Sequence, residues 1–272
     1  KTIFYKNLND ILNNKEIDFL IIAISWDQII KILPVLLKSK KKMLIEKPIA
    51  FNSVFLERLK RKNKNKLNNK YVGFNRRFYK TIEKLYERLL KKDLIYADIK
   101  ITENYNEIIK KYGNKIKNKT HLVTATSHMI DLVLFLFGKI KIKNLKTVRN
   151  KKNKCISTFA HCSNKKNVSI NISIFNENPT NSGITCYFGD GTTWKLSPLE
   201  VLSVYNKYNI IPVGKKRVRS YKPNLIKVYK EDSNIFKPGF YNQIKSILKK
   251  TPIASTIENN INLLKFCEKL RQ

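Results

Sequence analysis

Short apolar runs alternate with amphipathic patterns through the first quarter of the chain, and this alternation limits the possible folds more than any other feature. Residues 19–24 are apolar without interruption, which is typical of a parallel strand covered on both faces. The same reasoning predicts strands at 2–5, 43–45 and 71–74, with helices at 7–14, after a cap at Asp27, and from Ser53. Strands and helices in this order predict a doubly wound parallel sheet.

The strand at 43–45 ends at an acid and a base, Glu46 and Lys47, which Pro48 follows directly. Proline cannot donate a hydrogen bond to a neighbouring strand, so the chain has to turn there. In an open α/β sheet, ligands bind in the crevice outside the carboxyl ends of the strands. We therefore predict a binding site at this strand tip. The alternative is an ion pair at the surface with no ligand.

A second informative stretch is the apolar segment 121–138, which has the pattern of a buried helix that ends at a glycine. At about 3.6 residues per turn, Thr124, Ser127, His128 and Asp131 fall on one line along this helix. Because burying unpaired polar groups is costly, the line must face water, a polar partner or a ligand. From the residues alone, a hydrogen-bonded structural histidine is the favoured interpretation of His128, and a catalytic histidine is the alternative.

The rest of the chain predicts a different architecture. A helix at 80–92 and a strand at 95–101 precede a lysine-rich loop at 103–120, and alternating apolar residues at 168–174 predict a further strand. A hairpin turn is expected at 188–191, and Ser255 with Glu258 forms the pattern of a capping box before the last helix. These signals predict an open, largely antiparallel sheet with helices on one face.

The composition narrows the range of partners. The chain has 55 Lys and Arg against 20 Asp and Glu, a formal net charge of +35, but the basic residues are spread along the sequence and interleaved with Asn and Ile. We attribute them to a compositional bias and expect no specific nucleic-acid partner, only salt-sensitive attraction. A nucleic-acid binder, with its lysines on one face, is the third-ranked hypothesis.

The four cysteines have no close metal-ligand spacing, so we expect free thiols, no metal site and a reducing cytoplasm. No apolar run has the length of a membrane span, and the sequence shows no signal-peptide pattern, so we expect no membrane partner. No Gly-x-Gly-x-x-Gly occurs among the eight glycines. Because a mononucleotide-binding half needs a βαβ unit of about 30 residues with that turn, we expect the natural domain to start ahead of this chain.

Several of these segments together resemble the glucose-fructose oxidoreductase, inositol dehydrogenase and rhizopine-catabolism family (Gfo/Idh/MocA). They occur in the order expected for the family and span nearly the whole chain. The matching segments are Asp-Phe-Leu-Ile-Ile-Ala-Ile at 18–24, Glu-Lys-Pro-Ile-Ala at 46–50, Val-Gly-Phe-Asn-Arg-Arg-Phe at 72–78, Ser-His-Met-Ile-Asp at 127–131, and Phe-x-x-Gln at 240–243 before the capped last helix.

The resemblance implies an oxidoreductase that uses NAD or NADP and acts on a sugar, polyol or nucleotide sugar, with surface-polysaccharide metabolism as one setting. It implies that Lys47 and His128 are catalytic and that Lys47, Thr124 and His128 contact the substrate. The implied cofactor-binding residues are Ser25, Trp26, Glu46, Lys47, Pro48, Asn75 and Arg77, and the Lys47–Pro48 bond is a candidate cis bond.

One departure from the family pattern favours an alternative function. The family often has an Asp four residues before this histidine, where this chain has Thr124, so the imidazole loses an orienting carboxylate. Ser25 and Trp26 also stand where Pro and Asn are common. The alternative is a catalytically impaired sugar-binding or scaffold relative. Asp131 is interpreted as structural.

The predicted fold class is therefore α/β, with a partial Rossmann-type doubly wound parallel sheet followed by an α+β domain with an open, largely antiparallel sheet. We place the rest of a dinucleotide-binding domain at 1–78 and a domain for substrate binding and oligomerisation at 79–272. The resemblance implies a homodimer or homotetramer.

Overall fold

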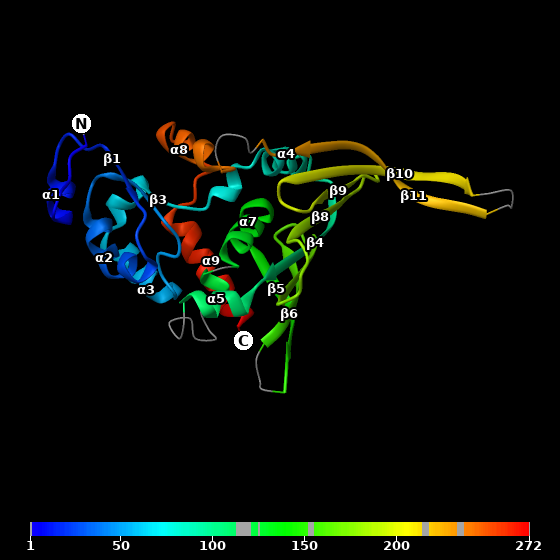
Figure 1. Cartoon of the computed structure of the whole chain (residues 1–272), viewed down its shortest axis with the longest axis horizontal. Coiled ribbons are helices and arrows are strands. Elements are labelled where there is room, and N and C mark those ends of the chain that lie inside the picture. Colours follow the sequence, from blue (N-terminus) through cyan, green and yellow to red (C-terminus); the bar gives the residue numbers. More distant parts are fainter. Residues whose placement is uncertain are drawn as a thin grey trace.

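The computed structural model describes residues 2–112, 121–124, 126–151, 155–213, 218–232 and 237–271. It contains two sheets, with a small one toward the N-terminus and a large one at the opposite side of the molecule (Figure 1). Helices α7 (Ser127–Phe137) and α9 (Ile257–Leu270) lie between the two sheets. The predicted α/β fold class is confirmed.

The small sheet is parallel and has the order β1 (Phe19–Ile22), β2 (Lys42–Ile45) and β3 (Lys70–Val72). Ile22 pairs with Ile45, which pairs with Val72, so the three strands end at one edge. Its helical elements are α1 (Leu8–Asn13), α2 (Trp26–Lys38), α3 (Ser53–Lys62) and the short 3-10 helices η1 (Lys64–Asn69) and η2 (Asn75–Phe78). The sheet thus presents the residue after each strand at a common rim.

The large sheet has the strand order β11-β10-β9-β8-β4-β7-β6-β5, in which the described pairs are antiparallel except β4 with β7. Its strands are β4 (Leu94–Glu103), β5 (Ile140–Arg149), β6 (Cys155–Asn164), β7 (Ser169–Asn176), β8 (Gly183–Phe188), β9 (Thr193–Leu196), β10 (Val201–Val213) and β11 (Val218–Lys230). The β10–β11 hairpin extends from the body as an arm (Figure 1).

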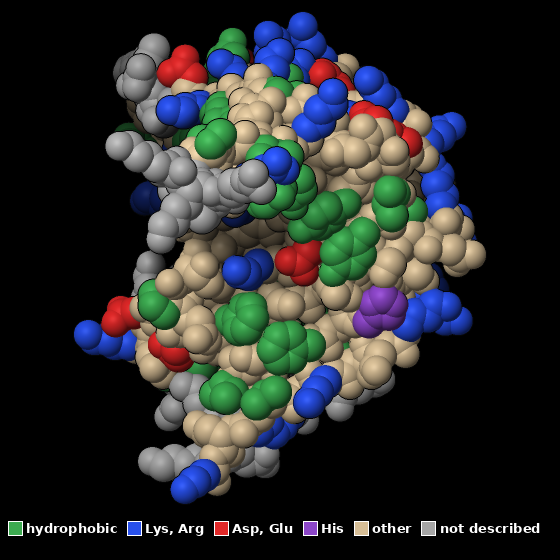
Figure 2. Space-filling model, turned by 90° about the vertical axis from the view of Figure 1, so that its right-hand side faces the viewer, with side chains coloured by type: hydrophobic (Ala, Val, Ile, Leu, Met, Phe, Trp, Pro, Cys, Tyr) green, Lys and Arg blue, Asp and Glu red, His purple; other side chains and the backbone are tan. Residues whose placement is uncertain are grey.

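Helices cover one face of the large sheet, as predicted. The register places Ile99 between Ile172 and Ile184, and all three side chains are buried beneath those helices. The remaining helices are α4 (Lys80–Leu89), α5 (Tyr105–Tyr112), α6 (His121–Thr124) and α8 (Phe240–Leu248). The opposite face of the sheet is open, and Figure 2 shows hydrophobic side chains gathered in the middle of that side. Tyr187 and Phe159 are exposed on it.

Two predicted elements are wrong. Residues 2–5 form no strand, because no described strand lies beside them, and Phe4 is 90% exposed. The predicted loop at 103–120 contains α5, which Asn104 starts by accepting a hydrogen bond from the Glu107 N–H at 3.1 Å. Residues 113–120 lie outside the described part of the chain.

Helix starts also differ from the prediction. Ser25, not Asp27, precedes α2, because the Ser25 carbonyl accepts from Gln28 and Ile29 at 3.0 Å. The predicted helix at 121–138 is two helices, α6 and α7, with residue 125 outside the described residues.

The start of the last helix differs as well. The capping box of α9 is formed by Thr256 and Asn259. Ser255 cannot serve as the cap, because it is fully buried with its Oγ 3.5 Å from Asp131 Oδ1.

Two other predictions concern the cysteines and the membrane. The four cysteines are free thiols, as expected. In the portion of the chain that the structure describes, we find no helix with the length and apolar character needed to cross a membrane.

Candidate active site

The tip of β2 carries the first two charges of the site. Glu46 follows the strand and donates its N–H to the Ile22 carbonyl at 2.9 Å, which fixes its backbone at the common rim. A Cβ at Gly73 would lie 2.9 Å from Glu46 Oε2, so a larger residue where β3 ends would displace this carboxylate. Burial raises the pKa of Glu46, opposed by the charges of Lys47 and Lys237.

Lys47 turns from the strand tip toward the helices of the second half of the chain. The Lys47–Pro48 peptide bond is cis, as the resemblance suggested. The Lys47 Nζ donates a hydrogen bond to the Thr124 carbonyl oxygen at the end of α6, at 2.5 Å. Burial lowers the pKa of Lys47 to about 8, and Glu46 and Glu103 oppose that effect while Arg76 adds to it. The Lys47 ammonium is therefore partly buried, and it loses its proton more readily than an ordinary lysine.

His128 lies at the start of α7, one turn after Thr124. Its ring packs edge-on against Phe74, with ring centroids 5.5 Å apart. The His128 Nδ1 is buried and has no hydrogen-bond partner among the described residues. Burial and the charges of Lys47, Arg76 and Lys237 lower the pKa of His128 well below 6.5. The imidazole is therefore neutral at pH 7, within the field of Lys47.

The structure adds three charged residues that we did not single out from the sequence: Arg76, Glu103 and Lys237. Burial raises the pKa of Glu103, opposed by Arg76 and then Lys47. Glu103 is the last residue of β4, an acid at a strand tip like Glu46, and that similarity could have identified it. Our incorrect loop prediction for 103–120 concealed it.

Asn75 and Arg77 make other contacts. Asn75 is buried and donates from Nδ2 to the Pro238 carbonyl at 3.0 Å. Arg77 forms a buried bidentate ion pair with Asp131, from Nε at 2.7 Å and from Nη2 at 2.6 Å. This pair agrees with the structural interpretation of Asp131. Cofactor contacts for Asn75 and Arg77 stay predictions.

Ser25 and Trp26 lie at the start of α2, just beyond the end of β1. Because β1 and β2 run parallel in register, this helix start faces the same rim as Glu46. The Trp26 ring packs edge-on against Phe51, with centroids 4.9 Å apart. Their predicted role beside a cofactor is not tested by these contacts. The structure thus brings Lys47, Thr124 and His128 together and sets Arg77 apart.

Comparisons with solved structures address the fold. A dehydrogenase (MviM) from Clostridium difficile matches with a TM-score of 0.68 and 18% identity, over 98% of this chain and 82% of that one. UDP-N-acetylglucosamine 3-dehydrogenase GnnA from Acidithiobacillus ferrooxidans matches with a TM-score of 0.66 and 14% identity, over 98% of this chain and 81% of that one. This chain has the dehydrogenase fold.

A third solved structure with this dehydrogenase fold is a super-repressor mutant of Gal80p from Saccharomyces cerevisiae, with a TM-score of 0.68 and 15% identity, over 98% of this chain and 80% of that one. No protein-family model and no curated protein matches the sequence. At sequence identities this low, the similarity to the solved structures concerns the fold. For the fold, it confirms the resemblance to Gfo/Idh/MocA dehydrogenases that the motifs led us to expect.

Proposed function

We propose that this protein is a Gfo/Idh/MocA oxidoreductase that uses NAD or NADP and acts on a hydroxyl group of a sugar, polyol or nucleotide sugar. The observation that carries the proposal is the pairing of a partly buried ammonium with a neutral imidazole at the carboxyl rim of a parallel sheet. Lys47 and His128 come from different halves of the chain and lie in one electrostatic field. Pockets in such folds lie at this rim.

The residues at the rim fit the nicotinamide end of such a cofactor. The close approach of Gly73 to Glu46 keeps the rim free of a further side chain, and His128 Nδ1 is a buried polar atom without a described partner. Glu46, Lys47 and Pro48 would hold this end, with Ser25, Trp26 and Asn75 as further predicted contacts, whereas Asp131 holds the Arg77 side chain away from it. The glycine-rich turn that would hold the phosphates is not in the 272 residues. When bound, the cofactor supplies a ring that accepts or donates hydride.

The chain's own residues then manage the substrate oxygen and its proton. Lys47 donates a hydrogen bond to that oxygen and stabilises the negative charge that develops there. His128, neutral at pH 7, accepts the hydroxyl proton. Its positive charge would be disfavoured by burial and by the neighbouring charges of Lys47 and Arg76, so the proton has to leave the imidazole quickly.

A sugar-binding or scaffold protein with impaired catalysis is the second candidate. It is favoured by Thr124, which offers His128 no carboxylate, and by the unpartnered His128 Nδ1. An imidazole without an orienting partner is a weaker base. The fold is also that of Gal80p, whose solved structure is named for a repressor mutant. This candidate would bind a sugar without turning it over.

The test uses the protein encoded by the complete reading frame. NADH and NADPH binding is measured by nicotinamide fluorescence, and turnover is measured on a panel of sugars and UDP-sugars. We expect one cofactor to bind and one substrate to be oxidised, with turnover lost in Lys47→Ala and kept in Lys84→Ala, an exposed lysine outside the site. Absence of binding by either cofactor would end the dehydrogenase proposal. Binding without turnover of any substrate would favour the scaffold.

Location and assembly are part of the proposal. Four free thiols are compatible with a reducing cytoplasm. The open face of the eight-stranded sheet would provide the contact of a homodimer, or one contact of a homotetramer. Surface-polysaccharide metabolism would supply nucleotide-sugar substrates, the class that GnnA is named for.

A further inference from the structure

A cavity of about 290 Å³ lies among α4, α7 and α8, separate from the lysine–histidine site. Neither Lys47 nor His128 lines it. Arg77 does, through a side chain that Asp131 and the Ile253 carbonyl hold in place, the latter at 3.1 Å from Nη1. Because those contacts are buried, the base of the cavity has a fixed shape.

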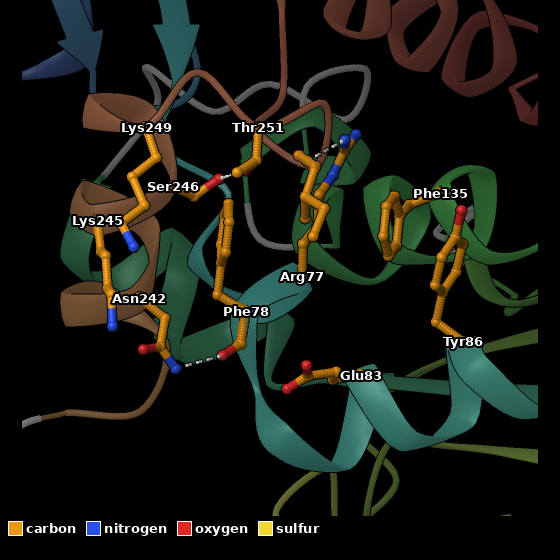
Figure 3. A pocket seen from close by; sticks show the side chains of 11 residues that line it. Arg77, Phe78, Glu83, Tyr86, Phe135, Asn242, Lys245, Ser246, Lys249 and Thr251 are labelled. Carbon is orange, nitrogen blue, oxygen red and sulfur yellow. Dashed lines mark hydrogen bonds between the residues drawn. The ribbon is translucent and has the colours of Figure 1, made fainter.

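Aromatic rings form one wall of this cavity. Tyr86 from α4 and Phe135 from α7 are stacked, with centroids 5.0 Å apart and ring planes 16° apart. The Arg77 guanidinium lies 5.0 Å from the centroid of the Phe135 ring. Phe78 adds a further ring to the lining. Figure 3 shows Phe78 and Arg77 between this aromatic wall and α8. Because Tyr86 and Arg77 cover the two faces of Phe135, a ligand ring would meet ring edges there, an edge-to-face arrangement that aromatic rings favour.

The opposite side carries uncompensated positive charge. Lys245 and Lys249 are four residues apart on α8, so they project from the same face of that helix (Figure 3). Both are exposed, and neither forms an ion pair with a described residue. Glu83 is the single acid among the lining residues, and Asp131 already pairs with Arg77. The lining therefore has a net positive charge beside an aromatic wall.

We propose that this cavity binds a small organic anion, with a flat ring against Tyr86 and Phe135 and a carboxylate or phosphate at Lys245 and Lys249. The volume limits the ligand, because cavities for drug-sized molecules range from about 300 to 1,000 Å³. The cavity is at the lower limit, so it admits a molecule with one ring system. Asn242 and Ser246 also line the α8 side, where Asn242 donates to the Phe78 carbonyl at 3.4 Å and Ser246 is hydrogen-bonded to Thr251.

Four probes separate the parts of the proposal. Phenyl phosphate and benzoate have both ring and charge, inorganic phosphate has charge alone, and benzyl alcohol has the ring alone. Binding is measured by isothermal titration calorimetry on the complete protein. We expect phenyl phosphate or benzoate to bind at least about tenfold more tightly than either single-feature probe, because ring burial and charge-assisted hydrogen bonds both contribute. The better of the two identifies the preferred anionic group.

Two variants with the same change in net charge locate the binding. Lys245→Gln with Lys249→Gln should weaken the better probe by about tenfold or more, the loss expected for one or two charge-assisted hydrogen bonds. Lys141→Gln with Lys143→Gln, exposed on β5, should leave it unchanged. Equal weakening in both variants, or phenyl phosphate and benzoate binding no tighter than inorganic phosphate, would overturn the proposal. NADH binding, measured in parallel, reports on the active site independently.

Discussion

At the scale of single residues, Lys47 decides how the proposed chemistry depends on pH. Alcohol oxidation needs a protonated Lys47 and a neutral His128. Burial sets the pKa of Lys47 to about 8 and lowers the pKa of His128 well below 6.5. We predict that kcat/KM decreases above a pH of about 8, as Lys47 loses its proton. On the acid side, kcat/KM should decrease only below pH 6.5, where His128 gains a proton.

The Lys47→Arg variant tests whether Lys47 causes the decrease of kcat/KM at alkaline pH. Arginine keeps its proton across this range, so the decrease above pH of about 8 should disappear, at a lower overall rate because the guanidinium has a different shape. The Lys47→Ala variant should lose about 10²–10³ in kcat, the cost of removing one donor to a developing oxyanion. A Lys47→Arg profile that keeps this decrease would assign it to another group.

The buried Arg77–Asp131 ion pair is expected to stabilise the folded protein. Asp131→Asn leaves the Arg77 guanidinium buried opposite a neutral amide, and breaking a buried pair by removing one partner costs about 3–5 kcal/mol. We expect a decrease of that size in the free energy of unfolding, measured by urea titration. Glu87→Gln removes the exposed partner of Lys84 and should change it little. Equal effects of the two would contradict the structural role of Asp131.

The residues of the site were predictable from the sequence to different extents. Glu46, Lys47 and His128 carried local signals, a strand tip and a polar line on an apolar helix. We recognised no local signal for Glu103 and Lys237. Glu103 acts on Lys47 and Lys237 acts on Glu46, and both interactions join segments far apart in the chain. The Arg77–Asp131 pair joins residues 54 positions apart and has no local pattern.

At the scale of elements, the start of α9 gives a direct test of the observed cap. The Thr256 Oγ1 accepts from the Asn259 N–H at 3.2 Å, and the Asn259 side chain accepts from the Thr256 N–H at 3.0 Å. Thr256→Ala should lower the free energy of unfolding by about 1 kcal/mol. Glu258→Gln, at the third position of the box predicted from sequence, should lower it less. A larger decrease in the free energy of unfolding for Glu258→Gln than for Thr256→Ala would contradict the observed cap and favour the capping box predicted from the sequence.

Elements with strong periodicity were predictable, whereas their starts were not. The burial of Ile29, Leu33 and Leu37 in α2 follows from their spacing. Which of Ser25 and Asp27 precedes that helix depends on backbone geometry that periodicity does not contain. Helix α5 was missed because lysines mask its short apolar face. The signal was Asn104, whose side chain accepts from the backbone of the first turn.

At the scale of the whole molecule, the open sheet face is where we expect self-association. Tyr187 is 42% exposed on β8 and Phe159 is 36% exposed on β6, both on the face that the helices leave uncovered. Tyr187→Glu with Phe159→Glu should convert an oligomer to a monomer, because buried charges without partners are costly. Light scattering after gel filtration measures the mass. Val54→Glu, exposed on α3, is the control and should leave the mass unchanged.

The overall architecture was the most predictable level. Alternating apolar runs indicated the parallel sheet, and period-two patterns indicated the second sheet. The length of the β10–β11 arm and the strand order were not predictable, because both depend on pairings between distant segments. An example is the pairing of β4 with β7, the one parallel pair among the described strands of the large sheet. Nothing in the sequences of segments 94–103 and 169–176 indicates that they pair.

The central claim is that Lys47 and His128 act on the same hydroxyl group, and a double-mutant cycle on kcat/KM tests it most directly. The enzyme from the complete reading frame is compared with Lys47→Ala, with His128→Ala and with the double variant on the best substrate. Residues that act as a unit lose activity non-additively, so the double variant should be only slightly less active than the weaker single variant. A double variant whose loss equals the product of the two single losses would show that the two side chains act independently, and would contradict the account.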